Sequence, residues 1–182
     1  MITRFILVEA SLLAVAWILA WLLGIPLSHL WHMDTSGVLM GCSSTLPVIS
    51  LFFWLAQSRA ASCVALRELI QQQLLPHLRG ATFLQVLLLS MVAGLAEEVL
   101  FRGVIEVGLA RSLGPWSAMM LSAILFGLCH ALTPVYFLLA TGMGLYLSLV
   151  WMASGQLISP IITHALYDLI ALWWYLRQSQ AD

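Results

Sequence analysis

Charge is what this sequence lacks most. Only 8% of its 182 residues are charged, and lysine is absent, whereas soluble domains carry about 25% charged residues. Hydrophobic residues make up 62% of the chain, and its mean hydropathy is +1.00. Seven arginines against eight acidic residues give a formal net charge of −1, so the basic excess that nucleic-acid binding needs is missing. The composition predicts an integral membrane protein and argues against nucleic acid as a partner.

Cysteine is also scarce, with only Cys42, Cys63 and Cys129 in the chain. An odd number of distant cysteines forms neither a disulfide framework nor a CxxC metal site. We interpret all three as apolar packing residues. At about 20 residues per transmembrane helix, the length allows roughly six spans and leaves no room for a separate soluble domain.

Long apolar runs separated by polar, proline or glycine residues predict where the chain crosses the membrane. The expected spans are residues 5–24, 38–56, 82–111, 116–132, 135–153 and 157–176. Residues 59–80 mix apolar and charged side chains, which is typical of a helix lying in the membrane interface. The predicted fold class is therefore an all-α polytopic membrane helix bundle, with about six transmembrane helices and one interfacial helix. We divide it into an N-terminal two-span region with the interfacial helix, residues 1–80, and a four-helix catalytic core, residues 81–182.

The arginines predict the orientation of this bundle. In a six-span arrangement one side of the membrane carries most of them, namely Arg4, Arg59, Arg67, Arg79 and Arg177. The opposite side has only Arg111 near a loop. By the positive-inside rule both termini are expected in the cytoplasm. The small size and the lack of an extra domain favour a bacterial protein in the cytoplasmic (inner) membrane.

Ionisable side chains within apolar spans are costly, and each is a candidate functional residue. The second half of the chain holds six of them, namely Glu97, Glu98, Arg102, His130, His164 and Asp168. The first half has only Glu9, which we place near a membrane end, where it can reach the interface, and interpret as structural.

Helical spacing sorts the residues of the third span. Residues four apart share a face, so Glu98, Arg102 and Glu106 are expected to form a ladder of opposite charges. An ion pair of this kind can simply lock two helices together. Glu97 lies about 100° around the helix and has no such partner, which leaves its carboxyl group available. Gly94, one turn earlier, keeps the backbone open to close approach by another helix or by a substrate.

The fourth and sixth spans each carry a histidine with an i, i+4 neighbour. Phe126 precedes His130, and His164 precedes Asp168. Counted from the predicted span ends, Glu97 and His130 lie nearer opposite membrane faces, and either helix tilt or a third helix that runs past Arg102 would bring them level. Convergence of these helices would surround one cavity with carboxyl and imidazole groups, a constellation suited to proton transfer or metal binding.

At these residues the sequence resembles the CAAX protease and bacteriocin-processing family of intramembrane endopeptidases, also called Abi proteins. Three motifs occur in the family's order: EExxxR over Glu97–Arg102, FxxxH over Phe126–His130 and Hxxx(N/D) over His164–Asp168. The resemblance covers about residues 82–176, and three motifs at suitable spacing are far more specific than any one of them.

This resemblance implies a glutamate-dependent, metal-independent peptidase that needs no cofactor. It implies that Glu97 is the general base that activates water, assisted by His130. His164 and Asp168 would stabilise the oxyanion of the tetrahedral intermediate. The expected partners are the lipid bilayer and a membrane-associated protein or peptide substrate, which the sequence does not identify further.

The resemblance also implies supporting residues. Glu98 and Arg102 would order the site, and Phe126 would wall the pocket. The prenyl-protein proteases of the family have Asn where this chain has Asp168, and an ionised Asp cannot donate a hydrogen bond to an oxyanion. Asp168 is therefore expected either to carry a proton or to accept a hydrogen bond and orient its donor.

Two other hypotheses fit the same residues. His130, His164 and either Glu97 or Asp168 could ligate zinc, although the chain has no HExxH helix. Alternatively, the buried charges could serve a non-enzymatic immunity protein or a proton-coupled transporter.

Overall fold

The computed structural model describes residues 2–28 and 32–178, and these form helices joined by short loops. The first half comprises α1 (Ile2–Leu23), α2 (Thr35–Gln57), α3 (Ala61–Leu69), η2 (Ile70–Leu74) and α4 (Leu75–Leu78). The second half comprises α5 (Phe83–Glu98), η3 (Val99–Glu106), α6 (Val107–Leu113), α7 (Pro115–Cys129), α8 (Pro134–Ser154) and α9 (Ile158–Gln178). The η segments are π-helical turns. The predicted all-α class is confirmed.

Four helices in the described part of the chain are long and apolar enough to cross a membrane. They are α1, α2, α8 and the continuous 31-residue helix Phe83–Leu113, formed by α5, η3 and α6. They match the first, second, fifth and third predicted spans. The fourth predicted span corresponds to α7, which is apolar but has only 15 residues, and the sixth to α9, which has 21. The protein is a helical membrane bundle.

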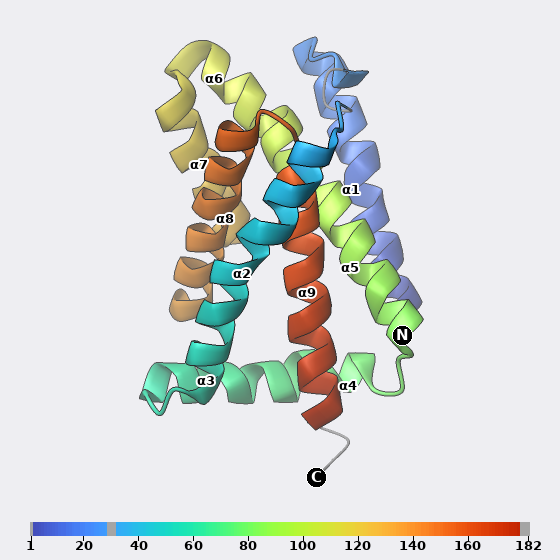
Figure 1. The fold of residues 1–182 in the computed structure, drawn as a ribbon, viewed down its shortest axis with the longest axis vertical. Coiled ribbons are helices and arrows are strands. Elements are labelled where there is room, and N and C mark those ends of the chain that lie inside the picture. The colour runs from blue at the N-terminus through green and yellow to red at the C-terminus, as the bar shows by residue number, and fades with distance from the viewer. Residues whose placement is uncertain (1, 29–31, 179–182) are drawn as a thin grey trace.

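One helix lies across the end of this bundle instead of along it. Figure 1 shows α3 at right angles to the long helices, at the end where both termini are found. The Arg67 side chain holds α3 to the end of α2, because its Nη1 donates to the carbonyl oxygens of Leu55 (3.1 Å) and Ser58 (2.8 Å). This arrangement is the one expected for residues 59–80.

The core of the bundle lies around α5, η3 and α9. Helix α9 packs between α2 and α5, α1 packs along α5 and η3, and α7 and α8 form a hairpin beside them. Small residues allow these close approaches. A Cβ at Gly41 of α2 would lie 2.7 Å from the Ser159 carbonyl oxygen of α9, and the Thr163 hydroxyl of α9 donates to the Gly41 carbonyl oxygen at 3.0 Å.

Polar residues are inside this bundle, and large apolar residues are outside. Buried polar side chains include Ser90, Ser122 and Ser148, whereas Trp17 and Trp21 of α1 are more than 70% exposed. An apolar exterior around a partly polar interior fits a lipid surrounding, because side chains facing lipid need no polar groups.

A hydrogen-bonded cap joins the start of α2 to the loop before α9. The Asp34 carboxylate accepts hydrogen bonds from the Ser36 hydroxyl (2.6 Å), the Gly37 N–H (3.0 Å) and the Gln156 amide (2.9 Å). These bonds, with that of Ser36 the largest contribution, hold the pKa of Asp34 below its usual range. The cap fixes where α2 begins and where the chain enters α9.

Candidate active site

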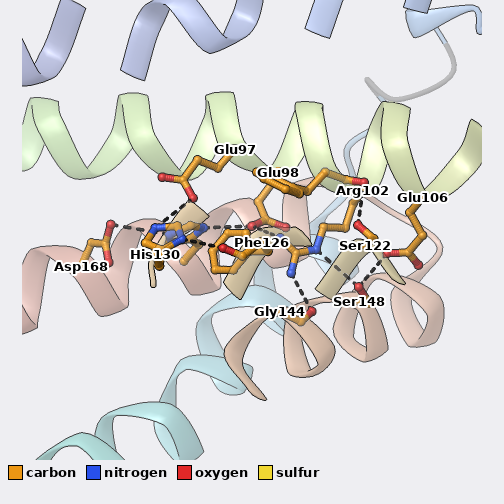
Figure 2. A network of polar contacts seen from close by, with 12 residues as sticks. Glu97, Glu98, Arg102, Glu106, Ser122, Phe126, His130, Gly144, Ser148 and Asp168 are labelled. Carbon is orange, nitrogen blue, oxygen red and sulfur yellow. Dashed lines mark hydrogen bonds and ion pairs between the residues drawn. The ribbon is translucent and has the colours of Figure 1, made fainter. Parts of the chain in front are cut away.

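The continuous helix Phe83–Leu113, called the central helix below, supplies four ionisable residues, namely Glu97, Glu98, Arg102 and Glu106 (Figure 2). Glu98 and Arg102 are fully buried, and the Arg102 Nη1 donates to the Glu98 Oε1 at 2.8 Å. This is the i, i+4 pair predicted from spacing. Burying such a pair carries a desolvation cost, which hydrogen bonds from its remaining polar atoms offset.

Arg102 has such partners on α8. Its Nη2 donates to the Gly144 carbonyl oxygen at 2.6 Å, and its Nε lies 3.4 Å from the Ser148 hydroxyl. That hydroxyl in turn donates to the Glu106 carboxylate at 2.7 Å. At the last step of the predicted ladder, Ser148 therefore bridges Arg102 and Glu106 in place of a direct ion pair between them. The π-helical turn explains the difference, since residues 102 and 106 both lie in η3, where the helical repeat is wider than that of an α-helix.

Glu98 also joins the central helix to α9. The Glu98 Oε1 that accepts from Arg102 lies 2.9 Å from the Nδ1 of His164. An ionised carboxylate only accepts hydrogen bonds, so Nδ1 carries the proton of this contact. The close approach depends on Gly94, where a Cβ would lie 2.9 Å from the Ala165 backbone nitrogen of α9. The open backbone predicted at this glycine is therefore occupied by a helix.

Glu97 faces His130 at the end of α7. The Glu97 Oε2 and the His130 Nε2 are 3.8 Å apart, too far for a direct hydrogen bond but close enough for one water molecule to contact both. The His130 Nδ1 donates to the Phe126 carbonyl oxygen at 2.9 Å, which leaves Nε2 facing the carboxylate. The depth difference counted from the predicted spans is therefore absent, because Glu97 lies within the 31-residue helix Phe83–Leu113 and α7 ends beside it at Cys129.

The Phe126 ring lies between the His130 imidazole and the Arg102 guanidinium. Its ring stacks on the His130 imidazole with centroids 4.5 Å apart, and the Arg102 guanidinium lies 4.9 Å from the same ring centroid. The phenyl ring therefore fixes the imidazole plane and separates His130 from the buried cation. Cation–π attraction adds to the packing of Arg102.

Asp168 lies one turn beyond His164 on α9. Its Oδ2 is 3.6 Å from the His164 Nε2, which is beyond the length of a normal hydrogen bond. Both side chains line a cavity of about 520 Å³, whose wall also includes Phe126 and His130. Away from the histidines the wall is formed by α2, α8 and the α3–η2 segment, mostly with apolar side chains. Glu97 is not part of this wall and lies beside His130.

The sequence interpretation missed one residue of this cluster. Glu9 of α1 was expected to reach the membrane interface, but its carboxyl group lies within hydrogen-bonding reach of the Glu97 carboxyl. The expectation was wrong because it considered only how far Glu9 lies from the end of α1. It did not consider which face of α1 packs on α5. The available signal was simply an acidic residue inside an apolar span.

The same side chains do not form a metal-binding set. Within residues 2–28 and 32–178, no three His, Cys, Asp or Glu side chains are grouped so that they could hold one metal ion.

Comparisons with known proteins show to which family this chain belongs. A family model described as "Type II CAAX prenyl endopeptidase Rce1-like" matches residues 79–170, just over half of the chain, and this segment contains all the motif residues. A search of the curated proteins and a search of the solved structures each returned no match. The chain belongs to the Rce1-like family of type II CAAX prenyl endopeptidases and is a membrane endopeptidase of that family.

Proposed function

We propose that this protein is an intramembrane glutamic endopeptidase that hydrolyses a peptide bond in a membrane-associated protein or peptide without a metal ion. The observation that carries the proposal is the 3.8 Å separation of the Glu97 carboxylate and the His130 imidazole beside a cavity that His130 lines. A water molecule placed between these two groups would be next to a base and a hydrogen-bonding partner.

The proposed reaction starts with attack of this water on the substrate carbonyl. Glu97 accepts a proton from the water as the carbon–oxygen bond forms, and later gives that proton to the leaving amine nitrogen as the peptide bond breaks. His130 orients the water through Nε2. No electrons are gained or lost, and Glu97 returns to its starting state.

The oxyanion of the tetrahedral intermediate is assigned to His164 and Asp168. In its imidazolium form His164 donates from Nδ1 to Glu98 and can donate from Nε2 to the oxyanion. The fixed Glu98–Arg102 pair supports this orientation without moving during the reaction. We assign Phe126 to the wall that keeps the imidazole of His130 in place.

The cavity is the proposed substrate site. Its apolar wall suits a chain that enters from lipid, and the histidines in that wall would bring the scissile bond to the proposed water. We also propose that the protein lies in a bacterial inner membrane with both termini in the cytoplasm, because the arginine-rich end of the bundle carries both termini and α3.

The test compares membranes that contain the wild type, Glu97→Gln or Glu68→Gln. Glu68 is an exposed residue of α3 and serves as the matched control. Protein termini are mapped in each membrane, and cleavage of a farnesylated CAAX peptide is measured in proteoliposomes. We expect Glu97→Gln to lower cleavage by about 10²- to 10⁴-fold and to let a small set of uncut proteins accumulate.

Two results would contradict the proposal. Full cleavage by Glu97→Gln would show that Glu97 is not the base. An unchanged set of protein termini in this variant would favour a non-enzymatic role. Metal independence is tested separately with a strong chelator and metal analysis of the purified protein. Loss of activity on chelation, restored by zinc, would contradict the metal-free mechanism.

A further inference from the structure

Helix α1 brings a second carboxyl group to the proposed base. Helix α1 packs along α5 and η3, and Glu9 extends from it to within hydrogen-bonding reach of Glu97. The Oε2 atoms of Glu9 and Glu97 are both shielded from solvent, and neither has a hydrogen-bond partner of its own among the described residues. Two shielded carboxyl groups therefore face each other across the contact between α1 and α5.

Such a contact needs a proton. Ionised carboxylates only accept hydrogen bonds, and two of them at close range in a low-dielectric site repel each other strongly. The charged or titratable neighbours of the pair include His164 and Asp168 of α9, His130 and Cys129 at the end of α7, Tyr136 of α8 and Glu98 of α5. The nearby cation Arg102 is bound to Glu98. The stable arrangement is one carboxylic acid donating to one carboxylate.

We propose that Glu9 is a positioning residue that shares a single proton with Glu97. One carboxyl group of the pair carries the proton and donates to the other, and this bond fixes the direction of the Glu97 carboxyl group toward His130. This inference rests on the proposed role of Glu97 as the base. The pair holds one proton at rest, two after Glu97 has taken a proton from water, and one again after the leaving amine has been protonated.

The first test replaces Glu9 by Gln and by Leu in the full-length protein. Gln keeps an N–H donor for the Glu97 carboxylate, so Glu9→Gln is expected to retain kcat within a few-fold of the wild type. Leu removes the donor and suits an apolar helix, so Glu9→Leu is expected to lower kcat by about 10- to 100-fold with KM unchanged. Cleavage of the farnesylated CAAX peptide in proteoliposomes gives both constants.

A role in packing alone would give a different result, because Gln and Leu would then both change stability and neither would affect kcat selectively. Wild-type kcat in Glu9→Leu, with Glu97→Gln inactive, would overturn the inference and leave the proposed function standing. Rescue by Gln but not by Leu supports it.

The second test does not depend on activity. Infrared difference spectra of the purified protein at neutral pH report the carbonyl stretch of protonated carboxyl groups. We expect Glu9→Gln and Glu97→Gln to change the same band, and Glu106→Gln, a buried carboxyl on the same helix, to leave it in place. A band that responds to Glu97→Gln but not to Glu9→Gln would overturn the shared proton. If Glu97→Gln cleaves fully, while Glu9→Gln and Glu97→Gln still change the same band, the proposed function is overturned and the shared proton stands.

Discussion

Glu98 holds the candidate site together, because its Oε1 accepts from both Arg102 and His164. Loss of either donor would leave the buried Glu98 carboxylate with fewer hydrogen bonds to offset the cost of its desolvation. Replacing Arg102 also leaves the Gly144 carbonyl oxygen without its hydrogen bond. The pair is thus more important for keeping the site intact than for the net stability of the bundle.

We predict that Arg102→Met lowers the free energy of unfolding by about 3–5 kcal/mol, because it leaves an unpaired buried carboxylate. Thermal or denaturant unfolding in detergent measures the change. Arg111→Gln is the matched control, because that exposed guanidinium donates to the Leu23 and Gly24 carbonyl oxygens at the surface and pairs with no carboxylate among the described residues. Equal losses in the two variants would contradict the prediction.

A second prediction concerns Asp168. If this group donates to the oxyanion, Asp168→Asn keeps a donor and retains kcat within a few-fold, whereas Asp168→Leu lowers kcat by about 10²- to 10³-fold. Steady-state cleavage in proteoliposomes measures both. An Asn variant as weak as the Leu variant would show instead that Asp168 acts as an acceptor that orients His164.

Residues on one helix were predictable, whereas contacts between helices were not. The Glu98–Arg102 pair follows from i, i+4 spacing alone. The Glu9–Glu97 contact depends on which face of α1 meets α5, and α1 is apolar nearly all round, so its sequence carries no stripe that marks the buried face. The 2.9 Å bond between His164 and Glu98 joins two helices in the same way, and the motifs place both residues without pairing them.

At the scale of the elements, the spacing of α5 and α9 controls the site. Gly94→Ala would place a Cβ 2.9 Å from the Ala165 backbone nitrogen and push the helices apart. We predict a loss of activity of at least about tenfold, together with a lower unfolding temperature, because the Glu98–His164 contact lengthens. Gly108→Ala is the control, since a Cβ there meets only the flexible ends of the Leu23 and Ile25 side chains and lies outside the cavity wall. Unchanged activity in Gly94→Ala would contradict the prediction.

The cap at the start of α2 predicts a pH-dependent stability. Since hydrogen bonds lower the folded-state pKa of Asp34, its contribution is present above the ordinary Asp pKa and is lost as the pH falls through the lowered value. Asp34→Ala should therefore unfold at a lower temperature than the wild type at neutral pH, with the gap closing in strong acid. Parallel thermal scans across pH measure it, and a gap independent of pH would argue against the cap.

The helices themselves were predictable because long apolar runs and Pro or Gly breaks mark them clearly. The observed α2 and α8 differ from the predicted spans by a few residues at each end. The π-helical turn Val99–Glu106 was not predictable, since no residue pattern distinguishes it from an α-helix. Within it, Ser148 bridges Arg102 and Glu106, a contact that i, i+4 spacing does not predict.

At the scale of the whole molecule, the two predicted regions meet in the cavity. Its wall combines residues of α2 and α3 from the first 80 residues with residues of α7, α8 and α9 from the core. We therefore propose that residues 1–80 shape the substrate site and that residues 81–182 supply its chemistry. The sequence could not predict this role, because the first region carries no motif.

The common end of the two termini gives a prediction about orientation. Reporter domains that are active on only one side of the membrane, fused to either terminus, should report the same cytoplasmic side. The same reporter inserted after Gly114 should report the opposite side, since this residue follows α6 at the other end of the bundle. Termini on different sides would contradict both the bundle and the orientation.

The order of the helices along the chain has a consequence for biosynthesis. His164 belongs to α9, whereas its partner Glu98 lies in the central helix and is translated 66 residues earlier. A nascent chain on the ribosome can therefore insert its first helices while the site still lacks an imidazole and a carboxyl group. Under the proposed mechanism, an unfinished chain cannot cut neighbouring membrane proteins, and hydrolysis begins only when translation has delivered α9 to the bundle.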